Sequence, residues 1–203
     1  MANSSSQIVP PQKTGASKKY EHVITLPSLE EAKKQFQSAK ARLLDISHWE
    51  QVAGKGSAQF VLTDKEGQPV QRKPNVGDHI KIDIPSPTHQ HDWVRIESMV
   101  EPSGTEETES IGIKVRPTSN PITKENHVSH FFSPESTSSF LLRREKTKLI
   151  AQVHGRNEVP NSETKSLWQK IKNWAVALGA MAGVADIQWE GLVKGLLQPE
   201  KTK

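Results

Sequence analysis

Apolar residues recur at steps of three and four in the C-terminal part of the chain. Between residues 162 and 185 the recurring positions are Leu167, Trp168, Ile171, Trp174, Ala175, Leu178, Met181 and Ala182. Lysine, glutamine and asparagine occupy much of the opposite side. This spacing predicts an amphipathic α-helix that Asn161 or Ser162 caps and that buries one face. From Ala175 onward the residues are almost all small and apolar, so other parts of the chain must surround the helix there.

A second apolar stripe follows Asp186. It consists of Ile187, Trp189, Leu192, Val193, Leu196 and Leu197. One unbroken helix over residues 162–197 would be about 54 Å long at the usual rise per residue, which exceeds a domain of this size. We therefore expect the helix to kink or break between Gly183 and Asp186.

The first half of the chain opens with strand and helix signals. Residues 20–26 have the pattern of a short strand, which Pro27 stops. Ser28 followed by Glu31 is a capping box, and the residues after it show one apolar face, which predicts a helix over residues 29–44. A second, short helix is expected over residues 45–53, with Gly54 at its end.

The middle of the chain reads as a succession of strands. Expected strands cover residues 58–63, 69–72, 79–84, 93–100, 111–115, 138–144 and 147–154, with a long irregular connection over residues 117–136. Short connections between consecutive strands favour an antiparallel sheet. Strict alternation in the fourth of these strands places Val94, Ile96 and Val100 on the core face, opposite Trp93, Arg95, Glu97 and Met99.

These elements together predict an α+β protein. We expect a curved antiparallel sheet of about six to seven strands, packed on a long C-terminal helix, with two small helices after the first strand. A length of 203 residues suits one domain with tails. The expected division is a disordered leader over residues 1–19, a single α+β domain over residues 20–185 and a helical extension with a tail over residues 186–203.

Composition excludes several classes of protein. The chain has no cysteine, which excludes disulfides, zinc-thiolate sites and a cysteine nucleophile. The net charge of +4 comes from basic residues that alternate with acidic ones, so we expect no nucleic-acid partner. Neither a secretory signal nor an apolar run of about 18 residues is present, which favours a cytoplasmic protein.

Two polar groups of residues were considered as sites. His89 and His91 with Asp92 could bind a divalent metal ion, but they follow two prolines, and a polar turn is the preferred interpretation. The sequence His-Gly-Arg-Asn-Glu at residues 154–158 could bring His154, Arg156 and Glu158 together as a general acid/base or a carboxylate clamp. The alternative is an ordinary strand end with a surface ion pair. No serine elbow, carboxylate pair or nucleotide fingerprint is present, which favours a binding protein over an enzyme.

The order of elements resembles the START-like helix-grip fold, in which a curved antiparallel sheet wraps a long C-terminal helix. The likeness rests on the strand at residues 23–26, the helices with Phe36 and Trp49, the strands of residues 58–154 and the stripe of residues 168–182. It implies a cavity between sheet and helix that binds an apolar small molecule, with no shared catalytic residues, and we expect no cofactor or metal. The expected ligand-binding residues are Trp93, Arg95, His154, Arg156, Trp168, Ile171, Trp174 and Leu178.

Two other functions stay open at this stage. The stripe of Trp189, Leu192, Val193 and Leu196 could dock a protein partner or a second copy of the chain, in a structural or protein-interaction module. A membrane-surface role for the C-terminal segment, with Lys165, Lys170 and Lys172 on its polar side, is a weaker alternative.

Overall fold

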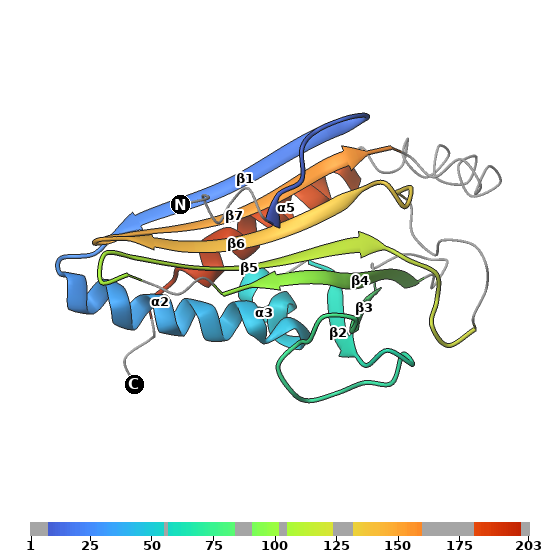
Figure 1. The fold of residues 1–203 in the computed structure, drawn as a ribbon, viewed down its shortest axis with the longest axis horizontal. Helices are drawn as coiled ribbons and strands as arrows, with labels where there is room; N and C mark the ends of the chain where they lie inside the picture. The colour runs from blue at the N-terminus through green and yellow to red at the C-terminus, as the bar shows by residue number, and fades with distance from the viewer. Residues whose placement is uncertain are drawn as a thin grey trace.

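The computed structural model describes residues 8–54, 57–83, 91–101, 105–123, 132–159 and 181–199. In these ranges an antiparallel sheet packs against helices (Figure 1). The elements in chain order are β1 (Ala16–Thr25), α2 (Leu29–Leu44), the 3-10 turn η1 (Ile46–His48), α3 (Trp49–Ala53), β2 (Gln59–Thr63), β3 (His79–Asp83), β4 (His91–Val100), β5 (Thr108–Pro117), β6 (Thr137–Glu145), β7 (Lys148–Glu158) and α5 (Met181–Leu196).

The strands form one seven-stranded sheet in the order β1-β7-β6-β5-β4-β3-β2. Every neighbouring pair is antiparallel. Strands β2 to β7 follow one another across the sheet, and β1 pairs with β7, so the chain's first and last strands lie side by side (Figure 1). The predicted α+β class and antiparallel sheet are confirmed.

The two small helices begin and end at the residues that the local sequence predicts. Ser28 caps α2, and its hydroxyl accepts a hydrogen bond of 3.2 Å from the Glu31 amide. The inner face of α2 buries Ala32, Phe36, Ala39, Leu43 and Leu44. Gly54 follows α3 with a φ of +97°, a conformation that favours glycine. Of the expected strand over residues 69–72, only a single bridge between Thr63 and Pro69 is present.

An irregularity in β4 reverses the predicted side-chain alternation. Ile96 pairs with Val115, but the next pair is Ser98 with Lys114, so Glu97 is an extra residue in the ladder. Because of this bulge, Met99 packs on the core beside Ile96. The prediction that put Val100 on the core face and Met99 on the opposite face is therefore wrong.

Four aromatic side chains fill the space between the sheet and α5. The ring centroids of Trp49 and Phe140 are 4.6 Å apart, and those of Phe140 and Trp189 are 5.3 Å apart. Phe60 lies 5.5 Å from Trp49 and 6.1 Å from Trp189. These edge and tilted contacts join α3, β2, β6 and α5 into one core.

Helix α5 corrects two predictions about the C-terminal segment. It runs without interruption from Met181 to Leu196, so the break expected between Gly183 and Asp186 is not found. Its apolar side chains, Leu192, Val193, Leu196 and the following Leu197, are at most 1% exposed and belong to the core. The proposed docking stripe is therefore covered by the chain itself.

The N-terminal boundary also differs from the prediction. Strand β1 begins at Ala16, so the last four residues of the expected leader belong to the sheet. Ile8 is only 1% exposed. The start of the segment before β1 is thus buried against the sheet, whereas residues 11–15 are exposed.

Candidate functional site

The concave face of the sheet, which carries the core, is the first candidate for a ligand site. On β3, β4 and β5 its inward positions include Ile80, Ile82, Val94, Ile96, Ile113 and Val115, and Asp92, the strand partner of Ile82, lies on the same face. Ile82, near the end of this surface, is only partly buried. Apart from Ile82 and Asp92, these side chains are at most 5% exposed, so other parts of the chain already cover most of this apolar face.

The four predicted ligand residues that the structure describes lie on the other face. Val94 and Val153 belong to the core, and alternation places Trp93, Arg95, His154 and Arg156 on the convex face. These four residues therefore face away from the space between the sheet and α5. The other four, Trp168, Ile171, Trp174 and Leu178, lie outside the described residues.

His154 is held neutral on the convex face. Burial, followed by the charges of Arg156 and Lys19, lowers the pKa of His154 to about 4. Arg156 Nη2 lies 3.2 Å from His154 Nδ1, and Gln152 Oε1 lies 3.3 Å from Nε2. A guanidinium can only donate, so Nδ1 accepts and the ring proton is on Nε2. His154 is therefore a packed, neutral group at physiological pH.

The expected convergence of His154, Arg156 and Glu158 does not occur. A Cβ atom on Gly155 would lie 2.0 Å from Glu158 Oε1. The Glu158 carboxylate therefore lies on the face to which a side chain at position 155 would point, which is the concave face. Asn157 between them has a φ of +54° and interrupts the alternation of β7. His154 and Arg156 face the opposite side, and no acid/base site is assembled from these three residues.

Trp93 and Arg95 belong to a separate cluster on the convex side of β3 and β4. The ring of Trp93 meets that of His79 edge-on at 6.5 Å. Burial lowers the pKa of His79, and the charge of Arg95 acts in the same direction. Arg95 is exposed and pairs across the strands with Arg116. Arg116 itself is neutralised by Glu97, to which its Nη2 donates at 3.3 Å.

The histidine pair considered as a metal site is only half described. His89 lies outside the described residues, and His91 is the first residue of β4, where it forms an ion pair with Asp83. Among the residues described, no three His, Asp or Glu side chains are grouped so that they could hold a metal ion.

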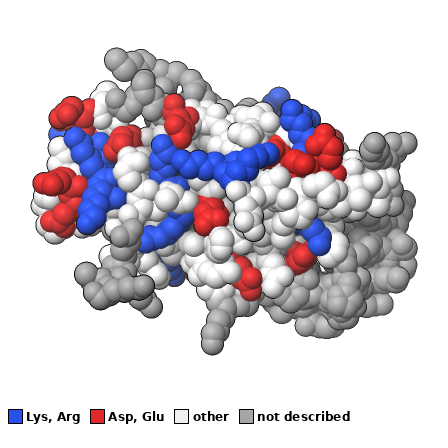
Figure 2. All heavy atoms as spheres, turned by 90° about the horizontal axis from the view of Figure 1, so that it is seen from below, with Lys and Arg blue, Asp and Glu red and all other residues white. Residues whose placement is uncertain are grey.

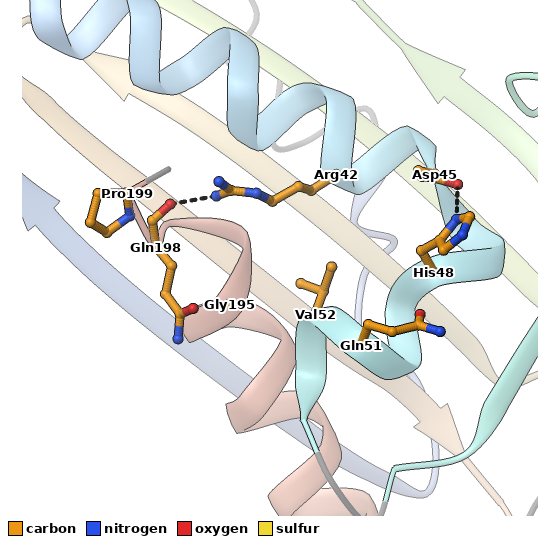
Figure 3. Close-up of a pocket in the computed structure, with 8 residues that line it drawn as sticks. All are labelled: Arg42, Asp45, His48, Gln51, Val52, Gly195, Gln198 and Pro199. Atoms are coloured by element: carbon orange, nitrogen blue, oxygen red, sulfur yellow. Dashed lines mark hydrogen bonds and ion pairs between the residues drawn. The ribbon is translucent and has the colours of Figure 1, made fainter. Parts of the chain in front are cut away.

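A surface cleft of about 360 Å³ lies where α2, α3 and the end of α5 meet (Figure 3). It is lined by Arg42, Asp45, His48, Gln51, Val52, Gly195, Gln198 and Pro199. Asp45 Oδ1 is 2.8 Å from His48 Nδ1, and both side chains are largely exposed. The cleft is open and lined by both polar and apolar residues, unlike the expected enclosed apolar cavity.

The cationic side of this cleft has a structural role. Arg42 Nη1 donates to the carbonyl oxygens of Leu196, at 3.0 Å, and Gln198. Gln35 Nε2 donates to those of Leu197 and Gln198, at 3.1 and 2.8 Å. These bonds satisfy carbonyl groups at the end of α5 that lack helical partners. The contributing residues are more than 140 positions apart, so no local sequence signal indicates the cleft.

Charged side chains are mixed on the face shown in Figure 2, where Lys and Arg lie next to Asp and Glu. Ion pairs of this kind connect α2 with the end of β4, as between Lys40 and Glu101 at 3.0 Å. Mixed signs give that face little net field. In the described part of the chain no helix is long and apolar enough to cross a membrane.

The element order, strand order and C-terminal helix define the START-like helix-grip fold. Among solved structures, the chain is similar to ginseng major latex-like protein 151 from Panax ginseng, at 12% identity and a TM-score of 0.36 over 75% of this chain and 89% of that one. It is also similar to protein Ms6760 from Mycobacterium smegmatis, at 12% identity and a TM-score of 0.38 over 91% of this chain and 95% of that one. A third similar structure is that of norcoclaurine synthase from Thalictrum flavum, at 6% identity and a TM-score of 0.37 over 91% of this chain and 88% of that one. No family model and no curated protein matches the chain.

Proposed function

We propose that the protein binds an apolar small molecule on the concave face of the sheet, between β3 to β5 and the C-terminal helical part of the chain, and performs no reaction on it. The observation that carries this proposal is the row of aliphatic side chains on the concave face of β3, β4 and β5, of which Ile82 is only partly buried. Burial of apolar surface is the main source of affinity for such a ligand.

The positions of the titratable groups support binding without catalysis. The histidines with a lowered pKa, His79 and His154, are on the convex face, away from the proposed ligand surface. The concave inward positions of β3 to β5 named above are aliphatic except for Asp92 at one end. Such a surface selects for shape and apolar area and offers few polar groups for chemistry.

The C-terminal stripe does not support the competing proposal of a docking module. Leu192, Val193 and Leu196 are fully buried in the chain's own core, and Trp189 packs on the same core. A partner could reach these side chains only if α5 left the sheet.

The test is a titration with oleate and with an anilinonaphthalene dye, followed by tryptophan fluorescence. We expect saturable binding to the wild-type protein. Ile82→Glu, which puts a charge on the concave surface, should weaken binding at least about tenfold, equivalent to about 1.4 kcal/mol. The matched control is Ile150→Glu on the convex face of β7, which should bind as the wild type does. Absence of saturable binding, or equal losses in both variants, contradicts the proposal.

A further inference from the structure

Residues 8–15, which we call the strap, lie on the convex face of the sheet. Figure 1 shows this dark-blue segment turning back at the start of β1 and crossing toward β6, on the side opposite to α5. The reversal occurs at Gly15, whose φ is +65° and where a Cβ atom would lie 2.5 Å from the Glu158 carbonyl oxygen. Only glycine fits this turn.

The strap ends in a socket that β5 and β6 form, made of Gly112, Ser139 and Leu141. A Cβ atom on Gly112 would lie 3.0 Å from Ile8 Cδ1, so the missing side chain makes room for Ile8. Ser139 Oγ donates a hydrogen bond of 2.9 Å to the Ile8 carbonyl oxygen. Leu141, the strand partner of Gly112, is 2% exposed. Because all three socket residues are in paired strands, the socket exists without the strap.

Asn157 holds the middle of the strap. Its Oδ1 accepts hydrogen bonds from the amides of Lys13, at 2.7 Å, and Thr14, at 3.2 Å. The backbone amide of Asn157 donates to Gln12 Oε1 at 3.1 Å. These contacts are polar, and water can replace them once the strap leaves and uncovers Asn157, which is 9% exposed beneath it.

The strap is attached by few interactions for its length. Ile8 is its one fully buried side chain, and residues 11–15 are exposed. One buried side chain and a small set of hydrogen bonds must offset the entropy of ordering eight residues. Pro10 and Pro11 reduce that entropy because their φ angles are fixed in the free segment as well. The released segment is therefore already close to its bound conformation.

We propose that the socket recognises a short Ile-Val-Pro-Pro segment, which the chain supplies to itself in the monomer and to a second copy when the strap is released. Exchange of an identical element between two copies needs no new contact, since the same residues meet in the same geometry. The occupant is a second copy because the chain itself carries the complementary segment. Binding of the strap to the socket of its own chain is favoured by the high effective concentration of the strap there. Exchange therefore requires a strap that cannot bind the socket of its own chain.

Two complementary variants test the exchange. Gly112→Val fills the socket but keeps the strap intact, and a β-branched residue suits this strand position. Ile8→Ser keeps the socket but removes the side chain that fills it. Each variant alone should sediment as a monomer, whereas an equimolar mixture at about 1 mM, near the effective concentration of a short linker, should form a heterodimer. A mixture that stays monomeric overturns the exchange between copies.

A peptide titration tests the socket independently of the Gly112→Val variant. A synthetic peptide of residues 8–15 should shift the amide NMR signals of Ser139 and Leu141 in the Ile8→Ser protein. The wild-type protein should need at least about tenfold more peptide, because its own strap competes. A peptide in which Ile8 is replaced by serine is the control and should cause no shift. No shift in the Ile8→Ser protein, or an equal response of the wild type, overturns the socket as a recognition site.

Discussion

A Cβ atom on residue 195 would lie 1.9 Å from the carbonyl oxygen of Val52, so Gly195 brings the backbone of α5 directly against the end of α3. One turn earlier, Gly191 stands in the same relation to the carbonyl oxygen of Ala53, at 2.2 Å. The two glycines are four residues apart and therefore share one helix face. The absence of side chains at these two positions lets the backbones of α5 and α3 approach closely. Such an approach permits weak Cα–H···O interactions and sets the depth at which α5 packs.

The first prediction concerns these glycines. Gly195→Ala should lower the free energy of unfolding by roughly 1–3 kcal/mol, because the new methyl group must push α5 away from α3. Urea unfolding measures the change. Lys194→Ala, at the exposed neighbouring position, is the matched control and should change stability by less than about 0.5 kcal/mol. Equal stability of both variants would show that the helices do not touch in this way.

The second prediction concerns the buried Arg144, whose side chain is 0% exposed. Its Nε donates to Glu109 Oε2 at 2.6 Å, and its Nη atoms donate to the carbonyl oxygens of Glu106, at 3.1 Å, and Lys146, at 3.1 Å. Arg144→Met leaves these acceptors without partners and should cost about 3 kcal/mol in stability.

Arg143→Met is the control for Arg144, because alternation points Arg143 to the convex face, where it is partly exposed. Thermal unfolding should show a clearly smaller loss for this variant. If the two variants unfold at the same temperature, the bonds from Arg144 to Glu106, Glu109 and Lys146 do not stabilise the fold.

The third prediction is a pH dependence that comes from His154. Its pKa in the folded protein is about 4, against an ordinary value of 6.5. Between these values the unfolded chain binds a proton that the folded chain does not. Stability should therefore fall as the pH is lowered from about 6.5 to about 4, by up to about 3 kcal/mol from this residue.

The contribution of His154 is separated from that of the carboxylates by comparison with His154→Gln. Arg116 and Lys114 outweigh the effect of burial and lower the pKa of Glu97, so the stabilising effect of this carboxylate is lost only as the pH falls below the ordinary pKa of 4.5. In urea unfolding at pH 7.5 and pH 4.5, the wild type should lose more stability than the variant. Identical losses would mean that His154 is accessible and protonates freely.

The fourth prediction tests the bulge in β4. Met99→Lys should lower the free energy of unfolding by about 2 kcal/mol, because it places a charge on the core face. Val100→Lys should cost only about 0.5 kcal/mol, since Val100 pairs with Gly112 on the convex side. The opposite ranking would restore the uninterrupted alternation and contradict the bulge.

The predictions from sequence succeeded where the signal is local. Helix α2 begins at Ser28 because a serine hydroxyl three residues before Glu31 satisfies a free amide, and both residues are visible in the sequence. The antiparallel sheet follows from short connections and an apolar face. The neutral state of His154 was not visible, since it depends on Gln152, Arg156 and the strand β1 beside it.

Features that depend on distant parts of the chain were missed. The bulge at Glu97 arises in the pairing of β4 with β5, and alternation in β4 alone gives no sign of it. The burial of Leu192 and Leu196 requires α5 to contact α3 through Gly191 and Gly195. An amphipathic stripe shows only that a face is covered, and it does not say whether the cover is the same chain or a partner.

The most direct test of the central claim is a methyl NMR titration of the protein with oleate. A ligand on the concave face should shift the methyl signals of Ile82 and Met99 and leave those of Ile150 and Val23, on the convex face, unchanged. Shifts confined to Ile150 and Val23, or no saturable shift at any of the four residues, would contradict a binding site between the sheet and its C-terminal helix.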